Sequence, residues 1–518
     1  MRHPHKILVI ALLTLIVIGL AQCGGPTGGN IYTKDGAQAD VYSDEDVAKG
    51  EALAAKHCQS CHSLPSPSLL NKVIWKDNVL PLMGEYLGLK PAAKSNTPRI
   101  DAAYKPSSPA MDERDWRLIN AYFITKAPDE LPIADRAEPT HQLPFFEVQS
   151  TPAEWVATQA FTSYVKIDQS VKPHRLIVCD GLNNKLVVLN DKGQTISTST
   201  LDAAIVDLNF QSDKILASVI GFDLKPNDIM VGSINQVAFD NKGAITIKAK
   251  PLFDRLNRPL SVNLIDLNQD GKKDYLINQY GNMAGKLSWF EGNTARKEHV
   301  LREKPGCIKA IIDYNNPGKV PDIWALFAQG DEGVFMYANK GKGIFEEKKI
   351  LSFPPSYGSI SFDLVDFNGD GFKDILYACG DNADHSQILK PYHGVYIYLN
   401  DGKNNFSQKY FYPINGCNKV IASDFDRDGD LDLAAVSAYP SEKIVWEGFI
   451  YFENTGGLNF KPYTPPSTVK FTHGMTIDAA DIDGDGKTDL LLGGAFSAKN
   501  LKGNDKHPLF LVLKNIVK

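Results

Sequence analysis

The sequence lacks two features that would place it in a membrane or on nucleic acid. Its longest apolar stretch, residues 7–21, is shorter than the roughly 20 residues that span a bilayer. There is no long basic run, and a formal net charge of −6 excludes polyanion binding as the main task. The 518 residues, 43% of them hydrophobic and 22% charged, predict a soluble protein of two or more domains with no nucleic-acid partner.

Cysteine is too sparse and too scattered for a small disulfide scaffold. The sequence has seven cysteines, and two of them are separated by only two residues in the segment 57–62, His-Cys-Gln-Ser-Cys-His. One more, Cys23, follows the first apolar stretch. The other four are expected to be buried free thiols: Cys179, Cys307, Cys379 and Cys417.

Residues 58–62 contain Cys-x-x-Cys-His, the attachment signature of a c-type haem. Two thiols one helical turn apart can add to the two vinyl groups of one porphyrin edge, and the adjacent imidazole then ligates the iron. A zinc site would need a second Cys/His pair nearby, and a redox dithiol would need a strand-to-helix context; the flanks offer neither. We therefore predict one covalent haem c on Cys58, Cys61 and His62.

The start of the chain is typical of an export signal over residues 1–22. Its end, Leu20-Ala21-Gln22-Cys23, resembles a bacterial lipoprotein signal, although Gln22 departs from the small residue usual there. The resemblance implies a lipidated Cys23 and a membrane anchor on the periplasmic side of a bacterial membrane. Plain secretion and an uncleaved anchor are the alternatives. Residues 23–43, rich in glycine and small polar residues, are predicted to be a flexible tether.

Three helical segments follow the tether. Ser43 and the acidic residues after it predict a helix that begins at residue 44 and leads into Cys58. A second helix is expected over residues 72–86, and a third over residues 113–126. Three helices around one Cys-x-x-Cys-His motif indicate a small all-α, class I-like cytochrome c domain at residues 44–132.

Two methionines compete for the sixth position on the iron. Met83 lies in a segment that resembles the Trp…Val-Leu-Pro-x-Met-Gly segment of cytochrome domains fused to propellers. Met111 precedes the last helix, the region where simpler class I cytochromes keep their ligand. The first resemblance favours Met83, and core packing is the competing role for either residue. His57 lies too close to Cys58 to reach the opposite haem face.

Beyond residue 132 the helical patterns disappear, and one segment occurs four times between apolar strands. Each copy has oxygen-bearing side chains at positions one, three, five and nine, with glycine at position six. This spacing is typical of a Ca²⁺ loop like the first part of an EF-hand, without its helices. The expected calcium ligands are Asp266, Asn268, Asp270 and Asp274; Asp366, Asn368, Asp370 and Asp374; Asp424, Asp426, Asp428 and Asp432; and Asp481, Asp483, Asp485 and Asp489.

The strand and loop pattern around these copies resembles the FG-GAP/VCBS repeat family. The family fold implies an all-β seven-bladed propeller over residues 162–518, after a connector at residues 133–161, with calcium between the first and second strands of a blade. A degenerate copy at residues 313–322 lacks the third acid, so we expect no metal there. The last blade lacks an outer strand, and we expect residues 143–150 to supply it.

Candidate ligand-binding residues fall on the propeller face opposite the calcium loops. Cys307, Tyr357, Cys417 and His473 precede innermost strands, where they either ligate a soft metal or fill the central channel. The insertion at residues 380–394 is long for a hairpin loop, and long loops of this composition often carry functional residues. Its alternative role is a polar loop braced against the next blade or the cytochrome. Its candidate catalytic residues are Asp381, Asp384, His385, Lys390, Tyr392 and His393.

Three functions follow from these features. The first is an exported haem c electron-transfer protein, working as an oxidoreductase with a periplasmic redox partner, whose propeller oxidises or binds a small molecule or carbohydrate. The second is a non-enzymatic module for glycan or protein binding with accessory electron transfer. The third is a carbohydrate lyase or hydrolase, with residues of the insertion as acid and base.

Overall fold

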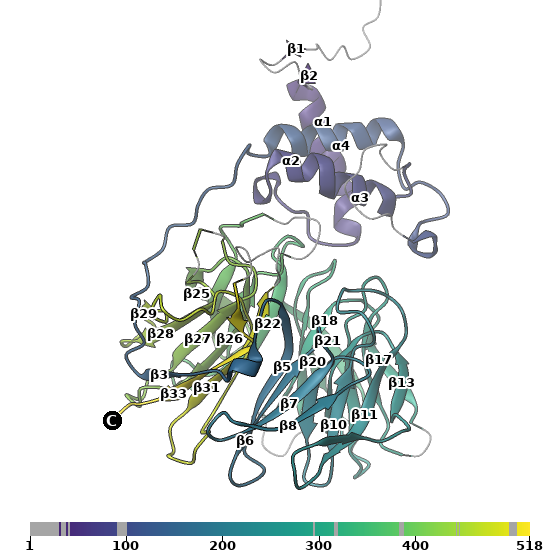
Figure 1. Ribbon diagram of the computed structural model, residues 1–518. Coiled ribbons are helices and arrows are strands. Elements are labelled where there is room, and N and C mark those ends of the chain that lie inside the picture. Colours follow the sequence, from purple (N-terminus) through teal and green to yellow (C-terminus); the bar gives the residue numbers. More distant parts are fainter. Residues whose placement is uncertain are drawn as a thin grey trace, which may run out of the picture.

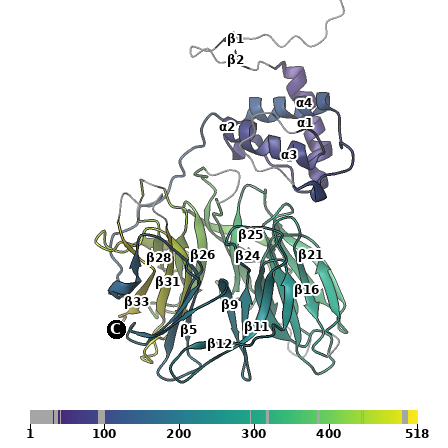
Figure 2. The ribbon, with the colours of Figure 1, turned by 45° about the vertical axis from the view of Figure 1, so that its right-hand side comes forward.

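The computed structural model describes residues 42–90, 101–293, 296–314, 320–382, 388–441, 443–444, 446–496 and 505–518, and the backbone of two short paired strands, β1 (Ile31–Tyr32) and β2 (Gln38–Ala39). The expected export signal, Cys23, Asp384 and His385 therefore lie outside the described residues. A helical region is followed by a larger region of β-sheets, and Figures 1 and 2 both show the helices at one end of the sheets. Within the described residues, no helix has both the length and the apolar character needed to cross a membrane.

The two long helices have the expected bounds. Helix α1 (Asp44–His57) begins after Ser43, whose Oγ accepts the backbone N–H of Asp46 at 3.1 Å. Helix α4 (Glu113–Lys126) begins after Asp112 in the same way. In both helices the cap satisfies a backbone donor that has no partner within the helix, and acidic residues in the first turn favour the helix dipole.

Helices α1 and α4 cross closely because α1 carries a glycine at the crossing. A Cβ atom added to Gly50 would lie 2.0 Å from the backbone oxygen of Leu118 on α4. The crossing completes a core that includes Ala54 and Ile119, both fully buried.

The expected second helix is continuous but contains a π-helical turn. Helix α2 (Lys72–Ile74) runs through π-helix η3 (Trp75–Val79) into α3 (Leu80–Tyr86). The N–H of Leu80 reaches the carbonyl of Trp75, five residues back, and Pro81, which has no N–H to donate, follows directly. Short 3₁₀ turns complete the region: η1 (Cys58–Ser60), η2 (Pro67–Leu69) and η4 (Ala102–Tyr104).

Seven antiparallel sheets, each built on four neighbouring strands, occupy the described part of residues 146–515, and a short pairing of β31 (Asp489–Phe496) with β5 (Ala160–Asp168) joins the seventh to the first. The first comprises β5 (Ala160–Asp168), β6 (Arg175–Asp180), β7 (Lys185–Asn190) and β8 (Thr195–Thr200). The second comprises β9 (Ile205–Phe210), β10 (Ile215–Val219), β11 (Gly232–Phe239) and β12 (Ile245–Ile247), with β13 (Phe253–Leu256) beside β11. The third comprises β14 (Pro259–Ile265), β15 (Asp274–Gln279), β16 (Lys286–Phe290) and β17 (Glu298–Arg302).

The fourth sheet comprises β18 (Cys307–Asp313), β19 (Asp322–Phe327), β20 (Gly333–Asn339) and β21 (Phe345–Ser352). The fifth comprises β22 (Ser359–Val365), β23 (Asp374–Cys379), β24 (Gly394–Asn400) and β25 (Phe406–Pro413). The sixth comprises β26 (Cys417–Ser423), β27 (Asp432–Ser437), β28 (Phe449–Asn454) and β29 (Phe460–Tyr463). The seventh comprises β30 (Gly474–Ala480), β31 (Asp489–Phe496), β33 (Phe510–Asn515) and β3 (Phe146–Gln149).

The first strands of successive sheets contact one another in a closed ring. Strands β5, β9, β14, β18, β22, β26 and β30 touch in that order, and β30 touches β5. The architecture is therefore propeller-like. The prediction for residues 143–150 is confirmed, since β3 pairs antiparallel with β33 and supplies the outer strand of the seventh sheet. Outside the ring, β4 (Val156–Ala157) pairs with β32 (His507–Pro508).

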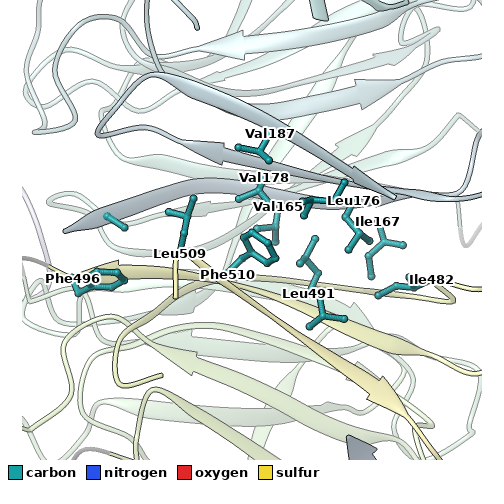
Figure 3. Packing of buried hydrophobic residues seen from close by; sticks show 13 residues of the cluster. Val165, Ile167, Leu176, Val178, Val187, Ile482, Leu491, Phe496, Leu509 and Phe510 are labelled. Atoms are coloured by element: carbon teal, nitrogen blue, oxygen red, sulfur yellow. The ribbon is translucent and has the colours of Figure 1, made fainter. Parts of the chain in front are cut away.

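The ring closes through an apolar core between the first and seventh sheets. Figure 3 shows Val165 and Val178 of the first sheet facing Leu491 and Phe510 of the seventh. All four side chains are almost completely buried. Each buried aliphatic or aromatic side chain of this kind contributes about 1.5–3 kcal/mol, so segments from opposite ends of the sheet region are held together without a disulfide among the described residues.

Candidate functional site

The two thiols of the attachment motif lie where α1 ends. Cys58 caps the helix and packs partly against the helical core, whereas Cys61 is exposed. Burial, and then the neighbouring Cys61, raises the pKa of Cys58. Both thiols are free and are available to a covalently attached group.

The imidazole of His62 is oriented by its own backbone neighbour. Its Nδ1 donates to the carbonyl oxygen of Ser63 at 2.9 Å, so in the neutral ring Nδ1 carries the proton and the Nε2 lone pair is available to a metal. Two thiols one helical turn apart and an imidazole with Nε2 not used by this hydrogen bond are the donor types that a c-type haem requires. A zinc site would need further Cys or His ligands, and none gather around this motif in the described part of the chain.

The two candidate methionines lie in different surroundings. Met111 is only 9% exposed and packs in the same apolar core as Ile119 and the stem of Cys58. Met83 lies half-buried on α3, and it is not a member of that core. Core packing thus accounts for Met111, and the choice of Met83 as the iron ligand stays a prediction.

The helical region lies on one face of the ring, which we call the docking face. It carries the loops between second and third strands and the links between sheets. Ser63, next to His62, has its Oγ 3.0 Å from Oγ of Ser352 at the end of β21. The hydroxyl of Tyr392 donates to the carbonyl oxygen of Leu69 at 2.9 Å, and Ile388 packs against the helical core. The residue that directly follows the Cys-x-x-Cys-His motif therefore contacts the sheets.

The insertion at residues 380–394 forms part of this contact. Lys390 and His393 are 2% and 1% exposed, and Nζ of Lys390 donates to Oδ1 of Asn382 at 3.0 Å. Burial, and then the charge of Lys390, lowers the pKa of His393 well below its usual value, so the ring is held neutral. The ring of Tyr392 stacks on Tyr357, with centroids 4.7 Å apart. These contacts agree with a loop braced against the helices, and catalysis by Asp381, Lys390, Tyr392 or His393 stays a prediction.

The residues expected around the channel mouth do not gather into a metal site. Cys307 and Cys417 are fully buried in two different apolar cores, and burial raises the pKa of each thiol. Burial, and then His507, lowers the pKa of His473 to about 4. Among the described residues no cluster of thiols and imidazoles forms. The two cysteines therefore fill the spaces between sheets.

The four acidic repeats form similar loops on the opposite face, which we call the loop face. We name them loop 1 (residues 266–274), loop 2 (366–374), loop 3 (424–432) and loop 4 (481–489). Each joins a first strand to a second strand, as expected. The first acid accepts the backbone N–H of the sixth-position glycine, as Asp481 does from Gly486 at 2.8 Å. That glycine has a φ of +81° in loop 4 and a positive φ in all four loops, a conformation that favours glycine.

The acids at positions one, three and five are brought together, as the calcium prediction requires. In loops 3 and 4 one oxygen from each of three carboxylates lies within 4.8 Å of the others. These are Asp424, Asp426 and Asp428, and Asp481, Asp483 and Asp485. Loops 1 and 2 have asparagine at position three, which supplies a neutral oxygen instead. Carboxylate and amide oxygens are the donors that hard divalent cations prefer, so these loops could bind a metal such as Ca²⁺.

The ninth acid of each loop has a role that the spacing did not reveal. Asp374 is fully buried; Oδ2 accepts the N–H of Phe367 and Oδ1 accepts the N–H of Asn400. Asp274, Asp432 and Asp489 make equivalent pairs of bonds. Asp322 of the degenerate copy also keeps the bond to the third strand. The ninth acid therefore binds the end of the third strand, or the residues just after it, in all five of these sheets, including the one whose copy lacks the third acid.

Charged side chains on the first strands were missed by the sequence reasoning. Nζ of Lys166 lies 3.1 Å from Asp478 on β30, and Nζ of Lys309 lies 3.2 Å from Asp363 on β22. Burial raises the pKa of Asp207 to about 7, although Lys419 and Lys166 act in the opposite direction. Around the ring the charges alternate in sign in the order Lys166, Asp207, Lys309, Asp363, Lys419 and Asp478. An alignment of the repeats strand by strand would have found them.

Comparison with protein families supports the repeat assignment for part of the chain. The FG-GAP-like repeat matches residues 313–377, which run from the end of β18 through loop 2 to β23. The chain thus contains an FG-GAP-like repeat region. A search of curated protein sequences finds no match.

Several solved structures are similar in shape at low identity. They include BBS1N in complex with ARL6DN (TM-score 0.44, 9% identity, 73% of this chain and 98% of that one) and Saccharomyces cerevisiae Sqt1 (0.41, 9%, 74% and 100%). An ancestral GH74 enzyme has a TM-score of 0.43 at 9% identity, over 72% of this chain and 52% of that one. The ring of sheet contacts, rather than these similarities, defines the architecture.

Proposed function

We propose that the chain is a c-type haem electron-transfer protein whose class I-like cytochrome c region is held on a calcium-binding, seven-bladed FG-GAP propeller. The observation that carries this proposal is the arrangement of residues 58–62. Two free thiols one turn apart precede an imidazole whose Nδ1 is already committed to the carbonyl of Ser63. When bound, the haem supplies one-electron redox chemistry.

The residues of the chain would attach and orient this group. Cys58 and Cys61 would hold the haem covalently at the end of α1, and Nε2 of His62 would bind its iron. The bond from Nδ1 to Ser63 fixes the ring orientation and strengthens Nε2 as a donor. Met83 would provide the second protein ligand to the iron, whereas Met111 packs in the helical core.

The position of the motif supports electron exchange with the surroundings of the docking face. Cys61 is exposed, so one side of the attachment segment is open to a periplasmic redox partner. The other side, through Ser63 and Leu69, touches the sheets. A small molecule or carbohydrate bound beside these contacts would lie close to the haem. The export signal and the lipid anchor at Cys23 place the protein, in this proposal, on the periplasmic side of a membrane.

A binding module with accessory electron transfer is the second candidate, and one observation favours it over acid–base chemistry. Lys390 and His393 are almost completely buried where the insertion meets the helices, so neither is open to a polymer substrate. A lyase or hydrolase would need these groups within hydrogen-bond reach of its substrate.

The calcium part of the proposal rests on the loop face. The clustered carboxylate and amide oxygens of loops 1 to 4 would bind Ca²⁺, and the backbone bonds to the first acid hold each loop in shape for it. Calcium bound there would brace the link between the first and second strands.

Covalent haem attachment tests the first proposal directly. The full chain is produced in a host that matures c-type cytochromes, and haem is measured as the pyridine haemochrome of the denatured polypeptide. We expect one haem per chain in the wild type and none in Cys58→Ser/Cys61→Ser. Cys379→Ala, which removes a thiol outside the motif, should retain the haem. A wild type without covalent haem would overturn the proposal.

A second measurement separates the oxidoreductase from the binding module. Ferric holoprotein is mixed anaerobically with sugars, alcohols and aldehydes, and the reduced haem band is followed. Reduction by one class identifies an oxidoreductase and its substrate. Binding seen by calorimetry without reduction identifies a binding module.

A further inference from the structure

The ammonium group of a lysine on the neighbouring strand enters loop 4. The ammonium group of Lys514, on β33, contacts Oδ1 of Asp483 and lies 3.3 Å from Oδ2 of Asp489 and 3.9 Å from Oδ2 of Asp485. The side chain of Lys514 is 20% exposed, so it lies largely inside the loop. The lysine therefore neutralises carboxylates that a divalent cation would also need.

The other three loops have no lysine at this place. The residues equivalent to Lys514 can be identified because the next residue, Asn515, donates its backbone N–H to the ninth acid of loop 4. The residues that donate in the same way to the ninth acids of loops 1, 2 and 3 are Gly292, Asn400 and Asn454. The residues immediately before these are Glu291, Leu399, Glu453 and Lys514.

None of the three counterparts can act as a cation in its loop. Glu291 pairs with His299 at 2.9 Å, and Leu399 packs in an apolar core. Glu453 accepts a hydrogen bond from Tyr463. Among the described residues, the seventh sheet is thus the one in which an ammonium group from the third strand enters an acidic loop.

Two further cations crowd loop 4. The guanidinium of Arg427, in loop 3, donates to the carbonyl oxygen of Gly486, and Nζ of Lys487 lies 3.5 Å from Asp485. Positive charge around a small set of carboxylates lowers their affinity for Ca²⁺, because the ion must displace the ammonium and meet the repulsion of the others.

We propose that Lys514 takes the place of calcium in loop 4, so that metal binds loops 1 to 3 and the seventh sheet is held without it. This inference rests on the proposed calcium function. It gives the last sheet a distinct role, because this sheet joins β3 to β33 and closes the ring. Closure then does not depend on the calcium concentration, whereas the other three loops respond to it.

Calcium stoichiometry of the full chain tests the proposal. Metal-free wild type, Lys514→Leu and Lys518→Leu are titrated with CaCl₂ in a calorimeter. Lys514→Leu introduces the residue type that the fifth sheet has at the equivalent position, Leu399. Lys518→Leu removes an exposed charge that lies outside loop 4 and serves as the control. We expect three calcium ions per chain for the wild type and Lys518→Leu, and four for Lys514→Leu. The additional site should have a dissociation constant of about 0.1–1 mM, as in extracellular calcium modules.

Each outcome separates the two proposals. Equal, non-zero stoichiometry in the wild type and Lys514→Leu overturns the role of Lys514 and leaves the calcium function standing. No binding to either protein overturns both. Circular dichroism shows whether Lys514→Leu is folded, and Lys514→Gln, which keeps a polar side chain without the charge, gives the same comparison if the leucine variant is not.

Discussion

The loop face and the docking face of the ring are built in different ways. On the loop face the same acidic loop recurs in four sheets, and each copy is ordered by its own backbone hydrogen bonds. On the docking face each contact occurs once: Ser63 with Ser352, Leu69 with Tyr392, and Tyr86 with Met283. The loop face therefore presents several similar loops, whereas the docking face holds the helical region through contacts that are each made once.

This difference matters because the faces depend on different interactions. The loop face depends on carboxylates that repel each other unless a cation or a backbone N–H is present. The docking face depends on hydrogen bonds and packing between the helices and the sheets. The connector adds a buried ion pair there, between Arg136 and Glu447 at 2.6 Å.

The largest expected effect comes from removing the charge that fixes the connector. Glu447 is completely buried, and Arg136→Ala would leave its carboxylate without its cation. We expect the free energy of unfolding of the sheet region to fall by about 3–5 kcal/mol, measured by urea denaturation. The double variant Arg136→Ala/Glu447→Gln should recover part of the loss. Equal stability of the single variant and the wild type would contradict the assignment of this pair.

The ninth acid and the fifth acid of one loop should behave differently without metal. In the presence of chelator, Asp374→Ala leaves two backbone N–H groups unpaired, and we expect a loss of roughly 2–4 kcal/mol in urea denaturation. Asp370→Ala, in the exposed part of the same loop, should change stability by no more than about 0.5 kcal/mol. Similar losses for both variants would show that the ninth acid has no special structural role.

Between the two faces, the charged first strands should make stability depend on pH. The pKa of Asp207 is about 7 in the folded protein and about 3.9 in the unfolded chain, so the folded state binds more protons between these values. The free energy of unfolding should therefore fall as the pH rises from about 4 to about 7, by roughly 2 kcal/mol after allowance for partial exposure. Asp207→Asn should flatten this dependence, and an unchanged slope would exclude Asp207 as its source.

The smallest effect is expected at the docking face. Tyr392→Phe removes the hydrogen bond to Leu69 but keeps the stacking on Tyr357, so docking should weaken by about 1 kcal/mol. Hydrogen exchange of residues 63–70 should then become up to about fivefold faster. Tyr410→Phe, away from the helices, is the matched control. The same protection in both variants would mean that Tyr392 does not hold the helical region.

Much of the local structure follows from short-range chemistry. Ser43 and Asp112 mark the starts of α1 and α4 because a cap needs only the next turn of backbone. The π-helical turn before Pro81 was not expected, because it depends on how the chain accommodates a missing donor inside a helix. The repeats predicted the loops, and the missing last strand predicted β3, because an unpaired edge needs a partner.

The sequence by itself determined the Cys-x-x-Cys-His segment, the helix that leads into it, the acidic loops and the strand that closes the ring, since each depends on neighbouring residues or on a repeat. Only the tertiary structure decided that both oxygens of the ninth acid accept backbone N–H groups, because one of these groups comes from the end of the third strand or the residues just after it. It also decided that Lys514 reaches loop 4 and that Tyr392 reaches Leu69, because these partners are far apart in the chain and meet only after the sheets and helices pack.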